Sequence, residues 1–290
     1  MMPLSGKTKI CAVIGDPIAH TLSPTIHNAA FKHLKLDFVY LAFRVKANDL
    51  ENAMQGLREL GIHGLNVTMP HKKSVISYLD KVDSAVKFLG SANTILNENG
   101  KLSGFNTDGI GALKALKENG AKLAEKKVLL LGAGGAAKAI AFALAKEAGS
   151  LCILNRAPEN AAVLADSLNR VYGPKIVGGA LSPNAIQKNL QDADVLVNAT
   201  LVGMYPTINQ SLVAPQWLKP NLAVMDIVYN PVETKLAKDA KAAGAEVISG
   251  VEMLIYQGAA SFKIWTDKSA PIGVMRNAAL NKLSNAGEHK

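Results

Sequence analysis

The strongest constraint on the fold of this chain is a glycine-rich hexapeptide between an apolar run and a helix-forming segment. Residues 128–131 (VLLL) are typical of a buried strand, residues 132–137 (GAGGAA) follow directly, and the alanine-rich stretch to about residue 147 predicts a helix. A G-x-G-x-x-A turn in this setting is typical of a dinucleotide site, because its glycines permit a tight turn and a close approach of pyrophosphate to the backbone. The helix N-terminus adds amide donors and the positive end of the helix dipole.

The end of the next predicted strand, residues 151–154, bears on the choice of cofactor. Enzymes that use NAD generally carry a carboxylate there, about 20 residues beyond the turn, which binds the ribose 2′-hydroxyl. This chain has Asn155 and Arg156 instead, and a planar guanidinium is suited to a 2′-phosphate. The sequence therefore favours NADP, with a solvated surface arginine as the alternative interpretation of Arg156.

Short apolar runs alternate with helix-period segments along most of the chain, as expected of an α/β protein. Helices are predicted from Pro24, after a cap at Asn48, over residues 107–119 and over residues 251–265, the last with an apolar face. Strands are predicted at residues 10–15, 38–45, 64–68, 92–96, 101–105, 128–131, 151–154, 195–198, 222–228 and 246–248. The second half of this pattern predicts a doubly wound parallel sheet.

Composition and charge exclude several classes of function. The 290 residues are 49% hydrophobic, enough for two domains with sizeable cores, and no apolar run is long enough to span a membrane. The formal charge of +9 comes from scattered lysines without a basic run, which favours small anions over nucleic acid as binding partners.

Cys11 and Cys152 lie in strand-like runs as expected of buried reduced thiols, so a cytoplasmic location follows. His71 has no cysteine or histidine partner at zinc spacing, and no metal is expected.

A second group of polar residues follows predicted strands in the first half of the chain. Asn66 and Thr68 lie on one face of the strand at residues 64–68, because alternate strand residues point the same way, and Lys72 follows just past its end. Asn93 begins another strand, and Asp108 lies at a strand–helix junction. Taken singly, Asp108 is also interpretable as a helix N-cap and Lys72 as a solvated side chain. Beside a nucleotide site, the group indicates a small polyhydroxylated substrate.

With these motifs in place, the chain resembles the shikimate dehydrogenase family over about residues 10–280. The resemblance rests on residues 15–24 (GDPIAHTLSP), 66–72 (NVTMPHK), 93–94 (NT), 106–109 (NTDG), 132–137 (GAGGAA), 155–156 (NR), 198–200 (NAT), 203–204 (GM), 226–231 (DIVYNP) and 250–259 (GVEMLIYQGA).

The resemblance implies a fold of two α/β domains. Residues 1–108 would form an N-terminal substrate-binding and catalytic domain, to which C-terminal helices at residues 251–290 return. Residues 109–250 would form a Rossmann-type domain that binds NADP.

The resemblance also implies a role for each matching residue. Lys72 and Asp108 correspond to the catalytic pair of the family. The substrate-binding positions are Asn66, Asn93 and Gln257 for the ring hydroxyls, with Thr68 beside them, and Thr21, Ser23 and Tyr229 for the carboxylate. The cofactor-binding positions are Gly132, Ala133, Gly134, Gly135, Ala136, Asn155, Arg156, Thr200 and Gly250.

The activity so implied is the reversible NADPH-dependent reduction of 3-dehydroshikimate to shikimate in aromatic amino acid biosynthesis, by a monomer or homodimer. The chain departs from the family pattern at Thr21, usually serine, at Ala157 and Asn160, usually threonine and a basic residue, and at Leu201. These departures keep open a quinate/shikimate dehydrogenase that uses NAD or NADP. A nucleotide-binding sensor without turnover and a nucleic-acid binder are further alternatives, and the intact Lys72 and Asp108 argue against the sensor.

Overall fold

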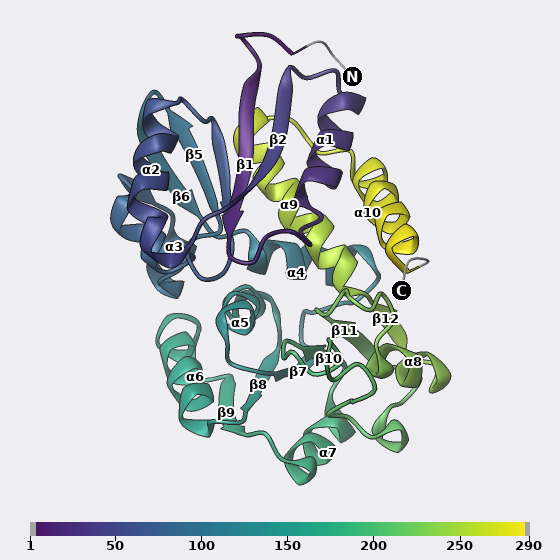
Figure 1. Ribbon diagram of the computed structural model, residues 1–290. Coiled ribbons are helices and arrows are strands. Elements are labelled where there is room, and N and C mark those ends of the chain that lie inside the picture. The colour runs from purple at the N-terminus through teal and green to yellow at the C-terminus, as the bar shows by residue number, and fades with distance from the viewer. Residues whose placement is uncertain (1–3, 288–290) are drawn as a thin grey trace. The chain divides into compact units, whose positions relative to one another are not determined.

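The computed structural model describes residues 4–287, which divide into two compact units. The described part of the first unit comprises residues 4–107 and 255–287, so the end of the chain returns to the unit in which the chain begins. The second unit comprises Asp108–Leu254. The colours of Figure 1 show the same arrangement, with the yellow C-terminal helix beside purple N-terminal elements. Each unit is built around one six-stranded sheet.

The first unit has a mixed sheet. The strand order is β2-β1-β3-β5-β6-β4, with β1 parallel to both β2 and β3, while β5 is antiparallel to β3 and β6. The short strand β4 pairs in parallel with β6 at the edge. The strands are β1 (Lys9–Gly15), β2 (Phe38–Arg44), β3 (Gly64–Val67), β4 (Lys81–Val82), β5 (Thr94–Glu98) and β6 (Lys101–Phe105).

The helices of the first unit include α1, whose first helical residues are Ser23 and Pro24, and α10, which lies beside α1 (Figure 1). Their bounds are α1 (Ser23–His33), α2 (Leu50–Glu59), α3 (Ser84–Leu89) and α10 (Ile272–Gly287), with the 3-10 helices η1 (Ala47–Asp49) and η2 (Ser74–Tyr78). The helix α9 (Gly250–Thr266) crosses from the second unit into the first.

The predicted cap of the second helix was wrong. Asn48 lies inside η1, and Asp49 takes the N-cap position of α2 without a side-chain hydrogen bond. A short 3-10 turn therefore precedes the helix and moves its start to Leu50. The sequence signal failed because two consecutive polar residues, Asn48 and Asp49, are both good N-cap types.

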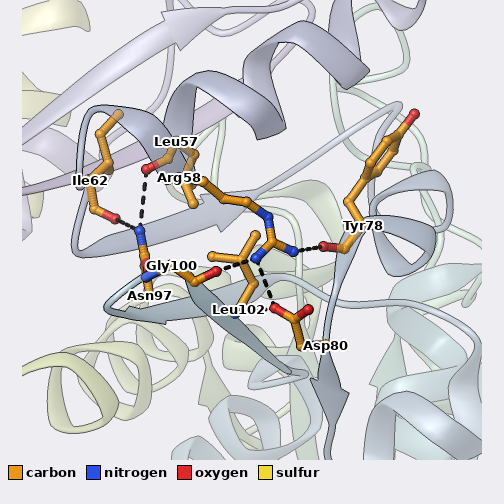
Figure 2. Close-up of polar contacts among 8 residues, drawn as sticks. All are labelled: Leu57, Arg58, Ile62, Tyr78, Asp80, Asn97, Gly100 and Leu102. Carbon is orange, nitrogen blue, oxygen red and sulfur yellow. Dashed lines mark hydrogen bonds and ion pairs between the residues drawn. The ribbon is translucent and has the colours of Figure 1, made fainter.

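Figure 2 shows a clamp that holds one end of the first sheet. The Arg58 guanidinium, near the end of α2, pairs with Asp80 at 2.9 Å and donates to the carbonyls of Tyr78 and Gly100. The Asn97 side chain reaches back to the carbonyls of Leu57 and Ile62. These contacts tie the helix to the β5–β6 hairpin. The hairpin turn has the positive-φ residues Asn99 and Gly100, as a two-residue type I′ turn requires.

The second unit has a sheet of order β12-β11-β10-β7-β8-β9 in which every pair is parallel. This is the doubly wound order of a Rossmann fold, whose topological switch point lies between β7 and β10. The strands are β7 (Lys127–Leu131), β8 (Ser150–Asn155), β9 (Ile176–Ala180), β10 (Val195–Asn198), β11 (Ala223–Asp226) and β12 (Glu246–Ile248). The doubly wound parallel sheet predicted for this half is confirmed.

Helices flank this sheet (Figure 1). The helices α4 and α5 pack closely, because a Cβ at Gly109 would come within 2.3 Å of the Ala139 carbonyl oxygen. Any larger residue would push these two helices apart. The helices are α4 (Asp108–Glu118), α5 (Gly135–Glu147), α6 (Pro158–Tyr172), α7 (Pro183–Asp192) and α8 (Lys235–Ala242). In the part of the chain that the structure describes, no helix has the length and apolar character needed to cross a bilayer.

Candidate functional site

Asn66 is the centre of a buried hydrogen-bond network in the first unit. The residue lies in β3 and is 7% exposed. Its Oδ1 accepts a 2.6 Å bond from the Tyr40 hydroxyl, and its Nδ2 lies 3.0 Å from the Asn93 carbonyl oxygen. The same Nδ2 lies 3.1 Å from Thr94 Oγ1 and 3.2 Å from Ser261 Oγ. Both polar atoms of Asn66 are therefore engaged by protein groups.

Asn93 is held in one orientation by backbone and side-chain donors. The Thr107 backbone N–H donates to Asn93 Oδ1 at 2.9 Å, and the Thr94 hydroxyl donates to the same oxygen at 2.9 Å. Asn93 Nδ2 donates to Thr107 Oγ1 at 3.0 Å. Because a backbone N–H can only donate, Oδ1 is identified as the end of the amide that accepts from the Thr107 N–H.

The helix α9 contributes polar groups to this network. Gln257, Ser261 and Trp265 are four residues apart and so lie along one stripe of the helix. Gln257 Oε1 lies 3.5 Å from Thr107 Oγ1, and Ser261 Oγ lies 2.8 Å from Thr94 Oγ1. Trp265 Nε1 donates to the Ile95 carbonyl, and its ring covers Gly64, where a Cβ would come within 2.6 Å. The helix is therefore anchored at the tryptophan and presents its polar groups to the sheet.

Thr21 and Ser23, predicted to bind a carboxylate, lie together at the start of α1. The Thr21 hydroxyl donates to Ser23 Oγ at 3.2 Å, and Ser23 in turn has a hydrogen bond with the Tyr40 hydroxyl. The network therefore runs without a break from Thr21 to Gln257. It joins five of the predicted substrate-binding residues: Thr21, Ser23, Asn66, Asn93 and Gln257.

Lys72 follows β3 in a turn at residues 69–73 and is half-buried. Its carbonyl accepts a 2.8 Å bond from the Ala92 N–H, and the neighbouring His71 is fixed by a 2.7 Å bond between Nε2 and the Val45 carbonyl oxygen. The turn is thus tied to two other segments of the unit. Thr68 packs against Gly15, where a Cβ would come within 2.4 Å of its methyl group. Asp108 directly follows Thr107 as the first residue of α4 and is 8% exposed.

In the second unit, the glycine-rich turn joins β7 to α5 at the switch point of the sheet. Gly132 has a φ of +110°, and a Cβ there would lie 2.9 Å from the Ala199 carbonyl oxygen, so both backbone and packing require glycine. A Cβ at Gly134 or Gly135 would meet no described atom within 4 Å. Packing does not explain these two glycines, whereas close approach of a ligand phosphate does. The turn therefore fits a dinucleotide pyrophosphate.

Asn155 connects this turn to the end of β8. Its Oδ1 accepts a 3.1 Å bond from the Ala133 N–H, and its Nδ2 donates to the Ala157 carbonyl at 2.9 Å. Arg156, the next residue, is exposed. No carboxylate ends β8, so the strand end carries no charge that would repel a 2′-phosphate.

The carboxyl ends of β10 and β11 are joined by a second buried network. Thr200 Oγ1 donates to Asn198 Oδ1 at 2.7 Å, and Asn198 Nδ2 donates to Asp226 at 3.0 Å. Burial raises the pKa of Asp226 although Thr234, Val228 and Asn198 all donate to the carboxylate. Gly250 is explained by packing, because a Cβ there would lie 2.4 Å from the Ile227 carbonyl oxygen. Tyr229 follows β11 and is half-buried.

Sequence reasoning missed four members of the first network: Tyr40, Thr94, Thr107 and Ser261. The motif NTDG at residues 106–109 contains Thr107 and NT at residues 93–94 contains Thr94, so a closer reading of the motifs signals these two. Nothing local marks Tyr40 in an apolar strand or Ser261 in a largely apolar helix. Their roles appear only when β2 and α9 pack onto the sheet.

These features define a class: a two-unit α/β protein with a Rossmann nucleotide-binding unit and a polar, hydrogen-bonding site in the other unit. Comparison with known protein families narrows this class. Residues 13–95 match the shikimate dehydrogenase substrate binding domain, residues 114–243 match shikimate/quinate 5-dehydrogenase, and residues 250–280 match the shikimate 5'-dehydrogenase C-terminal domain.

Individual relatives match along nearly the whole chain. A shikimate dehydrogenase (NADP(+)) of Moorella thermoacetica is 46% identical, over 95% of this chain and 94% of that protein. A crystal structure of a shikimate dehydrogenase in complex with NADP+ is 42% identical, with a TM-score of 0.90 over 97% of this chain and 98% of that one. A shikimate 5-dehydrogenase of Listeria monocytogenes in complex with shikimate and NAD is 37% identical, with a TM-score of 0.90 over 96% and 98%. The chain belongs to the shikimate dehydrogenase family, and the predicted family and fold class are confirmed.

Proposed function

We propose that this chain is an NADP-dependent shikimate dehydrogenase that reversibly reduces 3-dehydroshikimate to shikimate, a step of aromatic amino acid biosynthesis. The observation that carries the proposal is the unbroken network from Thr21 to Gln257 in a chain that also has a Rossmann unit. Family membership and the names of relatives at 43–46% identity support the same activity and the same cofactor. A polyhydroxylated acid needs many oriented donors and acceptors, and this network supplies them.

Lys72 and Asp108 are proposed as the catalytic pair. Reduction of a ketone needs hydride on the carbonyl carbon and a proton or strong donor at the oxygen. NADPH supplies the hydride when bound. A lysine side chain is protonated at neutral pH and can polarise and protonate that oxygen. The Asp108 carboxylate would orient the ammonium group and contact a neighbouring hydroxyl.

The substrate-binding roles follow the two ends of the network. At one end, Thr21 and Ser23 would hydrogen-bond the substrate carboxylate, with Tyr229 as a further donor. At the other end, Asn93 and Gln257 would bind ring hydroxyls. Thr68 and Asn66 are proposed for the same ring, although both polar atoms of Asn66 already have protein partners.

The cofactor would bind through the glycine-rich turn and the ends of β8 and β10. The pyrophosphate would contact the turn that contains Gly132, Ala133, Gly134, Gly135 and Ala136. Asn155 holds the turn, and Arg156 would pair with the 2′-phosphate. Thr200 and Gly250 are proposed as further cofactor contacts at the carboxyl ends of the strands.

The domain roles also belong to this proposal. Residues 1–108 with 251–290 would bind substrate, and residues 109–250 would bind NADP. We also propose a cytoplasmic location, which the free cysteines Cys11 and Cys152 support. A monomer or homodimer that binds neither nucleic acid nor membrane completes the proposal.

An initial-rate assay of shikimate and quinate, each with NADP and with NAD, tests the proposed function. The expected result is the highest kcat/KM for shikimate with NADP. The second candidate is a quinate/shikimate dehydrogenase that accepts NAD, motivated by Thr21 and by Asn160 in place of a basic residue. Comparable efficiency with quinate or with NAD would favour that candidate, and no turnover with either acid would contradict both.

A further inference from the structure

The hydroxyl of Tyr40 is a buried polar group to which the proposed chemistry gives no role. Tyr40 lies in β2, is 1% exposed, and donates to Asn66 Oδ1 at 2.6 Å. Its oxygen also has a hydrogen bond with Ser23. Burial raises the pKa of Tyr40 well above its usual value, so the phenol keeps its proton and remains a donor. The hydroxyl therefore connects two residues of the candidate site.

The ring of Tyr40 is held in place independently of its hydroxyl. The Asn28 side chain, from α1, bonds both the backbone N–H and the backbone carbonyl of Tyr40, each at 2.8 Å. The ring stacks on His27 with centroids 4.5 Å apart and an interplanar angle of 13°. Its centroid lies 5.9 Å from that of Trp265. A phenylalanine at this position would therefore keep the ring where it is and remove only the hydroxyl.

The Asn66 amide has one orientation, because its Nδ2 donates to the Asn93 carbonyl, which can only accept, and its Oδ1 accepts from the Tyr40 hydroxyl. An amide oxygen only accepts and an amide nitrogen only donates. With Oδ1 bonded to Tyr40, Nδ2 faces Thr94, and the Thr94 hydroxyl is left to donate its own proton to Asn93 Oδ1 at 2.9 Å.

We propose that Tyr40 is a positioning residue for substrate binding: its hydroxyl holds the Asn66 side chain in place and, through Thr94, reinforces the hydrogen bonds that hold the Asn93 amide. This inference rests on the proposed function, in which Asn93 binds a ring hydroxyl. The three bonds of the path, Tyr40 to Asn66, Asn66 to Thr94 and Thr94 to Asn93, are 2.6, 3.1 and 2.9 Å long. Each group in the path donates to the next one, so loss of the phenol hydroxyl would weaken the support of Asn93 without removing a contact with substrate.

The test is the kinetics of Tyr40→Phe in the full-length enzyme. We expect the KM for shikimate to rise about three- to tenfold, the size of one neutral hydrogen bond, with kcat and the KM for NADP nearly unchanged. The matched control is Ile26→Val, a fully buried residue of α1 whose truncation loosens the same core without touching the network. The control should leave the KM for shikimate unchanged.

A double-mutant cycle separates positioning from general loosening. In a Thr94→Val background the path is already broken, so adding Tyr40→Phe should raise the KM no further. Multiplicative effects of the two substitutions, or an equal rise of the KM in Ile26→Val, would overturn the inference. It would also be overturned if the effect of Tyr40→Phe disappeared in Ser23→Ala instead, because the phenol would then act through Ser23.

Failure of this inference can be distinguished from failure of the proposed function. A wild type that does not oxidise shikimate would contradict both. An active wild type in which the two substitutions have multiplicative effects would contradict the inference alone.

Discussion

Arg156 is the residue that we propose sets the cofactor preference. It is exposed, and it follows a strand end that carries no carboxylate. One partly exposed arginine–phosphate contact should contribute about 1–3 kcal/mol, or roughly 5- to 150-fold in affinity. Arg156→Ala should therefore weaken NADP binding by about that factor, leave NAD binding nearly unchanged, and make the two cofactors almost equivalent.

Fluorescence titration of both cofactors measures this effect. Arg170→Ala, in the last turn of the helix α6 that follows Arg156, also removes one positive charge and should change neither affinity. Asn160→Arg should strengthen NADP selectively, because it adds a second cation near the expected 2′-phosphate. If Arg156→Ala weakened NADP and NAD binding equally, Arg156 would not be the source of the preference for NADP.

Ser23 is the residue that tests the carboxylate end of the network. Loss of one charge-assisted bond of about 1.5–3 kcal/mol should raise the KM for shikimate in Ser23→Ala by roughly tenfold or more while kcat changes little. Steady-state kinetics with shikimate as the varied substrate measures it. Ser77→Ala, an exposed serine of the same unit, is the control. An unchanged KM in Ser23→Ala would place the carboxylate elsewhere.

At the scale of single residues, the sequence predicted the polar side chains at strand ends. It did not predict the residues whose hydrogen bonds position those side chains. Asn66, Asn93 and Lys72 could be found because motif and strand end coincide. Tyr40 and Ser261 could not, because a tyrosine in an apolar strand and a serine in a helix are ordinary residues until the tertiary packing joins them. Such positioning contacts are long-range and leave no local pattern.

Among the elements, the helix α9 has nearly its predicted bounds but also carries a polar stripe. Its apolar face was expected to explain its packing, whereas the structure also turns Gln257 and Ser261 toward buried polar groups. The strands of the second unit other than β9 were found because each is a short apolar run. Strands β4 and β9 were not found, since β4 has two residues and β9 contains two glycines.

His27 makes the packing of α1, β2 and α9 sensitive to acid. The ring is fully buried against Tyr40, Phe31, Phe262 and Trp265, and neither ring nitrogen has a hydrogen-bond partner among residues 4–287. Burial lowers the pKa of His27 from 6.5 to about 3. Between these two pH values the unfolded state binds a proton that the folded state excludes, so stability falls as the pH drops below 6.5.

The predicted effect of this histidine is a loss of about 2 kcal/mol of unfolding free energy between pH 7.5 and pH 5. Urea denaturation at the two pH values measures it. His27→Leu should lack this contribution, whereas His33→Gln, at an exposed histidine of the same helix, should keep it. Equal pH dependence in the wild type and His27→Leu would mean that the imidazole is not excluded from protonation.

The whole molecule has two units, to which we assign different tasks. In the second unit, the turn that follows β7 of the parallel sheet is suited to pyrophosphate. The first unit carries Lys72 and the polar network. The sequence predicted this division from the family resemblance, because the N-terminal strands alone do not reveal a mixed sheet. The antiparallel pairing of β5 with β3 is a long-range feature that no local pattern specifies.

Asp108→Asn tests the partner of the proposed catalytic lysine. An amide cannot hold an ammonium group as a carboxylate does, so turnover should fall while NADP affinity is retained. The comparison of kcat with the wild type measures this. A normal kcat would mean that Asp108 has no catalytic role and is only the first residue of α4.

The most direct test of the central claim is the rate at which Lys72→Ala oxidises NADPH with saturating 3-dehydroshikimate. Loss of the proton donor should lower turnover by roughly 10²- to 10⁴-fold, with NADP affinity nearly unchanged. Lys73→Ala, one residue further along and exposed, should turn over at the wild-type rate. If Lys72→Ala kept more than about a third of wild-type turnover, far above the usual acid–base loss, the assignment of Lys72 as the catalytic donor would be contradicted.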